Sequence, residues 1–246
     1  MSTKSTVQKL NELKLFGLSK SFEDRIIRPD HKDLSFEDFL NLLIEDEALF
    51  RQNKRQKRLV SQAKLKYPSA CFQDIDYTHK RGLLKTKVLN LQTTDWITKT
   101  QNILITGPTG VGKSFLAFAF GVWACHNGFS TYYFRWPRLL GDILASKGEG
   151  NYLKHLNKLA KVRLLIIDDF GLSPLSDSDR KDLLEIIEDR YLTGSTIITS
   201  QLPLKNWHQY INDPTLADAV CDRIFHLANK FELRGDSLRK NPTLLD

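Results

Sequence analysis

The stretch "NILITGPTGVGKS", residues 102–114, decides the fold class. Its first half, "NILITG" at residues 102–107, predicts a strand, and "GPTGVGKS" fits the Gly-x4-Gly-Lys-Ser pattern of a phosphate-binding loop, the Walker A motif. The apolar run from Lys113 to Asn127 predicts the helix that has to follow such a loop. Strand, loop and helix stand in the required order, so the sequence predicts a site for the phosphates of a nucleotide.

Each residue type in the loop has a physical role. Glycines let the backbone fold tightly around phosphates and aim its N–H groups at them. Lys113 would reach the β- and γ-phosphates, and the Ser114 hydroxyl would be a ligand of Mg²⁺. The start of the helix adds a partial positive charge. We expect these residues to bind ATP: Gly107, Pro108, Thr109, Gly110, Val111, Gly112, Lys113, Ser114 and Phe115.

A second motif, "RLLIIDDFG" at residues 163–171, combines a strand with two acids. Four apolar residues predict a buried strand, and adjacent charges at its end need a cation. Parallel strands end at the edge of the sheet where ligands bind. We therefore expect Asp168 to hold Mg²⁺ as the Walker B acid, and Asp169 to orient or deprotonate the attacking water. The alternative is that both acids cap the turn after the strand.

Predicted strands and helices alternate after residue 102. Further strands are expected at 130–136, 163–169 and 195–200. Helices are expected from Pro137, at about 151–161, and at 177–191, 204–210 and 214–228. This alternation predicts an α/β fold with a parallel sheet and helices on both faces. Together with the loop, it indicates a P-loop NTPase.

The composition changes near residue 67. We expect a small helical and basic N-terminal domain, residues 1–67, before an ATPase domain, residues 68–246. Two short helices are expected first, one ending near Gly17 and the other before Pro29. A longer helix starts at Ser35, which begins a weak form of the capping box.

The face of this longer helix changes from apolar to basic after Phe50. One interpretation is a helix that leaves the core and enters solvent. The other is a first half that docks and a second half that contacts phosphates, which the concentration of Lys and Arg between residues 51 and 66 favours. The second interpretation assigns DNA contacts to Arg51, Lys54, Arg55 and Arg58.

Composition limits the class of protein. The hydrophobic fraction of 41% supports a core in a chain of 246 residues and is too low for a membrane protein. The longest apolar runs are shorter than a membrane span, and the N-terminus has no signal-peptide pattern, so we expect a cytoplasmic protein. The formal charge of +7 suits a nucleic-acid partner, although it is weak support alone.

The two motifs, taken with four further segments, resemble the IstB-like ATPases. These are helper proteins of insertion-sequence transposons, related to DnaC-type helicase loaders in the AAA+ superfamily. The segments are "FEDFLNLLIEDE", "IITSQLPLKNWH", "DPTLADAVCDRI" and "GDSLRK", and the resemblance covers nearly the whole chain. It implies a P-loop fold of the AAA+ type and an ATPase.

The resemblance also implies roles for single residues. Gln201 is implied as the sensor-1 amide near the γ-phosphate, and Arg223 as an arginine finger on the neighbouring subunit's nucleotide. Arg239 is implied as a sensor-2 arginine. Guanidinium groups suit such roles because they stabilise charge on phosphate oxygens. The alternative for each of the three is a surface or salt-bridging residue.

Two departures from the wider AAA+ pattern affect these expectations. Asp169 stands where most members have Glu, so its side chain is one methylene shorter and its reach to the water is in question. The sequence ends soon after "SLRK", which leaves no room for a full helical lid domain. Both features are usual in this branch of the superfamily.

The implied function is that of an ATP-dependent transposition helper. It would assemble as a homo-oligomer on double-stranded DNA and stimulate a partner transposase. The helices between "YYFRW" and Walker B resemble an initiator-type insertion, where Lys147, Lys154 and Lys158 are either DNA contacts or solvated lysines. The alternative function is a replicative helicase loader, which the ATPase core does not distinguish. A small-molecule kinase is disfavoured because the sequence has no arginine-bearing lid insert.

Overall fold

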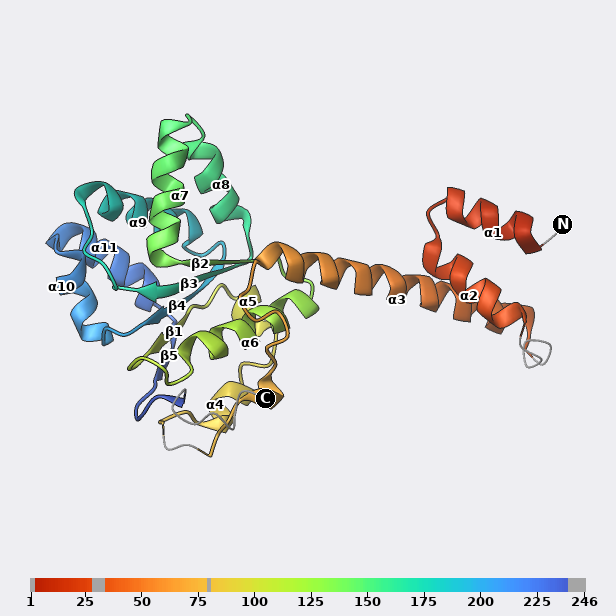
Figure 1. The fold of residues 1–246 in the computed structure, drawn as a ribbon, viewed down its shortest axis with the longest axis horizontal. Helices are drawn as coiled ribbons and strands as arrows, with labels where there is room; N and C mark the ends of the chain where they lie inside the picture. Colours follow the sequence, from red (N-terminus) through yellow and green to blue (C-terminus); the bar gives the residue numbers. More distant parts are fainter. Residues whose placement is uncertain (1–2, 28–33, 79–80, 239–246) are drawn as a thin grey trace. The chain divides into compact units, whose positions relative to one another are not determined.

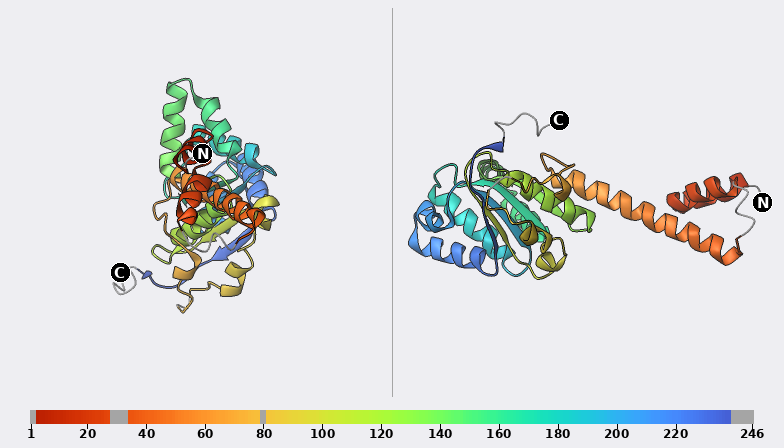
Figure 2. Two further views of the ribbon diagram at one scale, coloured as in Figure 1. Left: turned by 90° about the vertical axis from the view of Figure 1, so that its right-hand side faces the viewer. Right: turned by 90° about the horizontal axis from the view of Figure 1, so that it is seen from below.

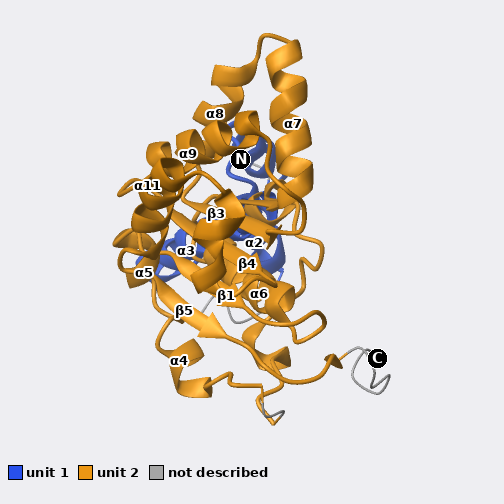
Figure 3. Ribbon diagram, turned by 90° about the vertical axis from the view of Figure 1, so that its left-hand side faces the viewer, with its two compact units in different colours: residues 1–58 blue, residues 59–246 orange. Residues whose placement is uncertain are grey.

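The computed structural model describes residues 3–27, 34–78 and 81–238 (Figure 1). The chain divides into two compact units, residues 1–58 and 59–246 (Figure 3). In the part of the chain described, no helix combines the length and the apolar character needed to cross a membrane.

The first unit is helical, as expected. Its elements are α1 (Thr3–Glu12), α2 (Phe16–Ile26) and the larger part of α3 (Phe36–Ala63). The hydroxyl of Ser35 caps α3 by accepting a hydrogen bond of 3.1 Å from the Asp38 backbone N–H.

The predicted helix end at Gly17 is wrong. Helix α1 ends at Glu12, and Gly17 lies in the first turn of α2. A Cβ added to Gly17 would lie 2.4 Å from the Cβ of Phe50 on α3. The glycine therefore allows close packing of two helices and does not end one.

The second unit contains a five-stranded sheet in which every neighbouring pair is parallel. The strand order is β2-β3-β4-β1-β5. The strands are β1 (Ile103–Thr106), β2 (Thr131–Arg135), β3 (Leu164–Phe170), β4 (Ser195–Ser200) and β5 (Asn229–Glu232). The first four lie where the alternation predicts them. Strand β5 was not predicted, because it is a short edge strand in which only Phe231 is buried.

Helices cover both faces of this sheet, as predicted (Figure 2). One face packs against α6 (Lys113–His126) and shorter segments, and the other against a layer formed by α7 to α11. Side chains alternate between the faces along each strand, so Ile103 and Ile105 enter the first core and Leu104 enters the second.

The remaining helices have these bounds: η2 (Phe72–Asp74), α4 (Lys85–Leu89), α5 (Asp95–Thr98), α7 (Trp136–Gly148), α8 (Tyr152–Lys161), α9 (Asp177–Arg190), η3 (Leu204–Asn206), α10 (Trp207–Ile211) and α11 (Pro214–Phe225). The last helix begins at the predicted cap, where the Asp213 carboxylate accepts a hydrogen bond from the Leu216 N–H at 3.0 Å. It ends three residues before the expected 228, because the chain then turns into β5.

The strand order determines which residues meet at the carboxyl edge of the sheet. Strand β4 lies between β1 and β3, so its end separates the loop after β1 from the acids of β3. The Gly107 N–H, the first of the loop, donates to the Ser200 carbonyl of β4 at 3.1 Å. The loop, the end of β4 and the acids of β3 therefore form one continuous site.

Candidate nucleotide-binding site

The loop between β1 and α6 has a backbone that depends on glycine. Gly107, Gly110 and Gly112 have φ angles of +148°, +85° and +91°, a region that other residues rarely adopt. Val111 between them is fully buried and anchors the loop in the core. The loop leads into the N-terminus of a 14-residue helix, whose first N–H groups have no partner within the helix.

The Lys113 side chain is folded back along this loop. It is 7% exposed, and its Nζ donates to the carbonyl oxygens of Gly107 and Pro108 at 2.7 Å each. The cation is thus held at the loop by neutral acceptors. A glycine-rich turn, a helix N-terminus and a buried ammonium group together fit a polyphosphate.

Asp168 lies at the centre of a cluster of hydroxyl groups. It is 4% exposed, and its Oδ1 accepts hydrogen bonds from Ser114 Oγ at 2.8 Å and from Thr199 Oγ1. Tyr133 donates its hydroxyl to Oδ2 at 3.1 Å. Burial, and then the neighbouring Asp168, raise the pKa of Tyr133, so this phenol stays protonated and remains a donor.

The structure therefore brings together the two residues expected to hold the metal. A carboxylate and a serine hydroxyl within hydrogen-bonding distance are oxygen ligands of the kind that Mg²⁺ takes in nucleotide sites. The donor set at Ser114 and Asp168 thus fits this ion.

Asp169 faces a different partner. The pairing of β3 with β4 is irregular between Ile167 and Phe170, and Asp169 within this bulge has a φ of +61°. Its backbone N–H donates to Thr199 Oγ1 at 3.2 Å. Arg135, at the end of β2, contacts the Oδ2 of Asp169 through Nε and through a terminal nitrogen, both at 2.9 Å. This hydrogen bond to Asp169 raises the pKa of Arg135.

Of the two expected sensor residues, the structure describes only Gln201. Gln201 is exposed and directly follows Ser200, whose carbonyl is bonded to Gly107. Arg239 lies outside the described residues. The residue before it, Leu238, donates its N–H to the Gly110 carbonyl at 3.0 Å, so the described chain leads to the loop at this point.

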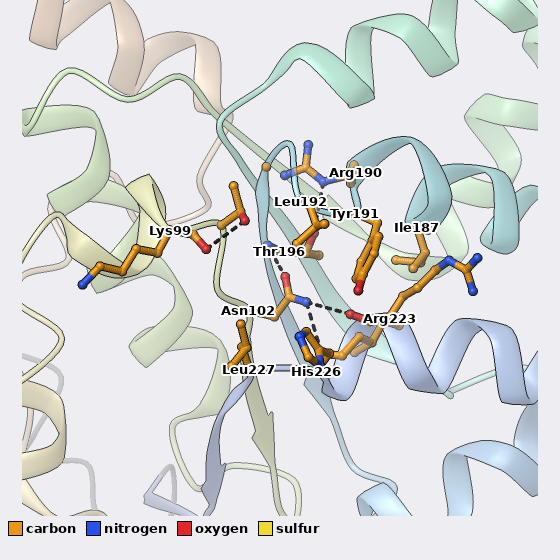
Figure 4. Close-up of a pocket in the computed structure, with 13 residues that line it drawn as sticks. Lys99, Asn102, Ile187, Arg190, Tyr191, Leu192, Thr196, Arg223, His226 and Leu227 are labelled. Atoms are coloured by element: carbon orange, nitrogen blue, oxygen red, sulfur yellow. Dashed lines mark hydrogen bonds between the residues drawn. The ribbon is translucent and has the colours of Figure 1, made fainter.

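Arg223 lies beside Asn102, close to the amino end of β1 (Figure 4). The loop follows the opposite end of this strand. Asn102, which precedes the first residue of β1, donates from Nδ2 to the Ile224 carbonyl at 3.1 Å. The Arg223 side chain contacts both carboxylate oxygens of Glu188, at 2.5 and 3.0 Å, and donates to the Ala219 carbonyl at 2.9 Å. The structure thus places Arg223 apart from the phosphate loop and from the two acids of β3 in its own chain.

Three residues of this site were missed at the level of sequence: Tyr133, Arg135 and Thr199. Each lies on a strand next to β3, and the register pairs Arg135 with Asp168. The spacing of Tyr133 and Arg135 puts both side chains on one face of β2, which was a usable signal. The order of strands was the missing information, because it determines which strand ends lie beside the acids.

The expected DNA-binding lysines of the helix pair α7 and α8 differ in their surroundings. Lys147 forms an ion pair of 2.7 Å with the nearly buried Asp182 and donates to Ser178 Oγ at 2.9 Å. Its charge is balanced within the unit. Lys154 and Lys158 are exposed on α8, and the Lys158 Nζ lies 5.0 Å from the centre of the Tyr132 ring.

Lys154 and Lys158 line a cleft of about 420 Å³ together with Lys161, which sequence reasoning did not single out. The other lining residues are Leu59, Gln62, Ser130, Thr131, Tyr132, Asn157 and Val162. The part of the cleft that the structure describes contains three lysines and no carboxylate. Its potential therefore favours an anionic ligand.

The basic part of α3 is exposed in the first unit. Arg51, Lys54, Arg55 and Arg58 all have exposed side chains. Arg51 forms an i,i+4 ion pair of 2.6 Å with Glu47, and the Lys54 Nζ lies 5.6 Å from the centre of the Phe16 ring.

Comparison with known proteins gives consistent matches over nearly the whole chain. The family model described as IstB-like ATP binding protein matches residues 8–245. A Sinorhizobium fredii protein, y4pL, named as an insertion-sequence ATP-binding protein, is 44% identical over 236 residues, which are 96% of both chains. A Pseudomonas fluorescens protein named for ATP binding in the insertion sequence IS1162 is 45% identical over 203 residues, 82% of this chain and 88% of that one.

Solved structures share the fold at lower identity. The DnaC helicase loader superposes with a TM-score of 0.52 at 23% identity and covers 64% of this chain and 94% of its own. The replication initiator DnaA, bound to AMPPCP and single-stranded DNA, gives a TM-score of 0.56 at 19% identity, covering 69% and 51%. At these identities both likenesses show a shared fold.

Proposed function

The chain belongs to the family of IstB-like ATP-binding proteins, and on this premise we propose that it is an ATPase that assembles on target DNA and stimulates a partner transposase. The observation that carries the proposal is the direct contact between Ser114 and Asp168 beside the glycine-rich loop. This contact joins the two sequence motifs into one nucleotide site.

We assign binding of ATP to the loop and Lys113. The loop N–H groups and the start of α6 would face the phosphates, and the Lys113 Nζ would exchange its two carbonyl acceptors for β- and γ-phosphate oxygens. Ser114 and Asp168 would hold Mg²⁺, which when bound neutralises charge on these phosphates.

We assign the attacking water to Asp169. Both contacts of Arg135 go to Oδ2, so Oδ1 is the oxygen that would accept the hydrogen bond of the water. Oδ1 would take the proton as the water oxygen bonds to the γ-phosphorus and the bond to the ADP oxygen breaks. Gln201 and Arg239 would contact the γ-phosphate from the two segments beside the loop.

We assign Arg223 to the nucleotide of a neighbouring subunit. Its position beyond the amino end of β1 supports this role, since the loop of its own chain follows the other end of the strand. Hydrolysis would therefore require a homo-oligomer in which each interface combines a loop from one subunit with an arginine from the next.

We assign double-stranded DNA to the basic surfaces of α3 and α8. Their exposed Lys and Arg side chains suit phosphate contacts, which are largely independent of sequence. The relatives are named for insertion sequences, which favours a transposase over a replicative helicase as the protein partner.

The proposal is tested by measuring the partner and the activity together. The protein is expected to co-purify with the transposase of its own insertion sequence in the presence of DNA and ATP, and to hydrolyse ATP faster with DNA than without. Lys113→Ala serves as the matched control and is expected to lose both properties. Co-purification with the replicative helicase in place of the transposase would overturn the assignment of the partner.

A further inference from the structure

Arg81 is a buried arginine beside the phosphate loop that neither motif includes. It is 6% exposed, and its guanidinium donates to two backbone carbonyls, Val111 at 2.6 Å and Asp76 at 2.7 Å. Within the described part of the chain, no carboxylate forms an ion pair with it, and its buried Nε has no hydrogen-bond partner. Burial lowers the pKa of this guanidinium, and the nearby Asp76 opposes that shift. Arginine still keeps its charge in proteins.

The guanidinium occupies the space next to the last glycine of the loop. A Cβ added to Gly112 would lie 2.4 Å from a terminal nitrogen of Arg81. Gly112 directly precedes Lys113, and the peptide bond that joins Val111 to Gly112 carries the carbonyl that Arg81 holds. In a planar trans peptide the C=O and the N–H point in opposite directions. Arg81 therefore fixes the Gly112 N–H on the side of the peptide away from the guanidinium.

The main chain of Arg81 contacts a third segment. Its carbonyl accepts a hydrogen bond from the Arg234 N–H at 2.9 Å, just after β5. The same C-terminal segment also reaches the loop at Gly110, whose carbonyl accepts a hydrogen bond from the Leu238 N–H at 3.0 Å. One residue thus connects the phosphate loop through its side chain and the C-terminal segment through its backbone.

We infer that Arg81 is a positioning residue of the nucleotide site. It orients the Gly112 N–H for the phosphates and places a buried positive charge beside the loop, which strengthens the attraction for a polyphosphate. It also couples the loop to the segment that leads to Arg239. The inference rests on the proposed function, namely that the loop binds ATP. Because ATP and ADP share the β-phosphate, both affinities depend on Arg81.

The test compares Arg81→Met with Arg81→Lys and with the parent protein. Met keeps much of the side-chain volume and removes every donor, whereas Lys retains one charged donor. Titration with MgATP and with MgADP should show both affinities reduced on the order of tenfold in Arg81→Met, the worth of a charge-assisted hydrogen bond, and less in Arg81→Lys. Arg138→Met is the control, because that side chain on α7 is 81% exposed and pairs only with Asp142 among the described residues. Its affinities should equal those of the parent.

Thermal unfolding, measured alongside, separates positioning from a purely structural role. A lower melting temperature in Arg81→Met with parent affinities for both nucleotides overturns the inference. Lys113→Ala is titrated in parallel. If it too binds as the parent does, the loop does not bind ATP and the proposed function fails; if only Arg81→Met binds normally, the inference alone fails.

A second measurement uses the parent protein and does not depend on the variants folding. Hydrogen exchange at the amides of Arg234 and Leu238 should slow when MgADP binds, since both amides donate to the connected segments. If exchange at both amides is unchanged when MgADP saturates the protein, the phosphate loop, the segment of Arg81 and the segment after β5 are not coupled.

Discussion

Asp168 and Asp169 are adjacent in the chain, yet the bulge in β3 gives them separate surroundings. Asp168 stays in register with β2 and lies among three hydroxyl groups, whereas Asp169 has a left-handed backbone and turns toward Arg135. An unbroken strand would also point the two side chains to opposite faces. The bulge adds a change of direction, so the two acids can serve different steps of one reaction.

The proposed role of Asp168 in holding Mg²⁺ predicts a defect that depends on the metal. Asp168→Asn removes one negative charge from the expected Mg²⁺ site, so nucleotide affinity should fall in the presence of Mg²⁺ and change little in EDTA. Equilibrium titration with and without the metal measures this difference. Asp142→Asn is the control for the loss of one negative charge. This acid lies on α7, 4.0 Å from Arg138, and is not part of the expected metal site. Equal losses with and without Mg²⁺ would contradict a metal role.

The proposed role of Asp169 in preparing the attacking water predicts a defect in hydrolysis alone. Asp169→Asn should bind ATP with parent affinity and hydrolyse it more slowly by about 10²–10⁴, the usual contribution of a positioned acid–base group. Single-turnover hydrolysis measures the rate, and dissociation from DNA should become slower because the ATP-bound state persists. Hydrolysis at the parent rate would leave Asp169 with a structural role only.

Among the helices and strands, the sequence was sufficient where local pattern determines structure. The strand at 103–106, the loop and α6 follow from one motif, and the proline at position 137 lies in the first turn of α7 as predicted. Strand β5 was missed because an edge strand with one buried residue shows no apolar run. The prediction that a helix ends near Gly17 is wrong because this glycine allows close packing against Phe50, a residue distant in sequence. Arg135, Thr199 and Arg81 reach the site through strand order and chain connection, which no local pattern reveals.

The cleft beside α8 predicts a change in salt dependence. Replacing Lys154, Lys158 and Lys161 together by Ala should reduce the slope of log K against log salt by roughly 0.9 for each phosphate that the protein no longer neutralises. DNA affinity measured across a salt series gives this slope. Lys147→Ala is the control and should leave the slope unchanged, since Asp182 already balances its charge. A parent slope in the triple variant would make these lysines ordinary solvated residues.

The basic part of α3 gives a parallel prediction for the first unit. Replacing Arg51, Lys54, Arg55 and Arg58 by Ala should also flatten the slope. The matched control changes the same net charge elsewhere in the unit, at four exposed lysines: Lys4, Lys9, Lys14 and Lys20. Equal slopes in the two quadruple variants would favour the interpretation of α3 as a helix that simply enters solvent.

For the molecule as a whole, the position of Arg223 predicts complementation between inactive subunits. Arg223→Ala should bind ATP but lose hydrolysis that depends on assembly, and Lys113→Ala should fail to bind ATP. Mixing the two variants should restore part of the activity, at interfaces where an intact loop meets an intact arginine. ATPase assays over a range of mixing ratios measure this. If mixed oligomers form and remain inactive, Arg223 does not act on a neighbouring subunit.

The separation of Arg223 from the loop along β1 also limits the symmetry of any assembly. The four residues of β1, about 13 Å of extended chain, separate Arg223 from the phosphate loop. Two subunits related by a two-fold axis would have to present both features on one self-complementary patch. Features at opposite ends favour a head-to-tail contact, which either closes into a ring or continues as a helix. An open helix has polarity: one terminal subunit keeps a loop that no arginine reaches, so that end hydrolyses ATP last.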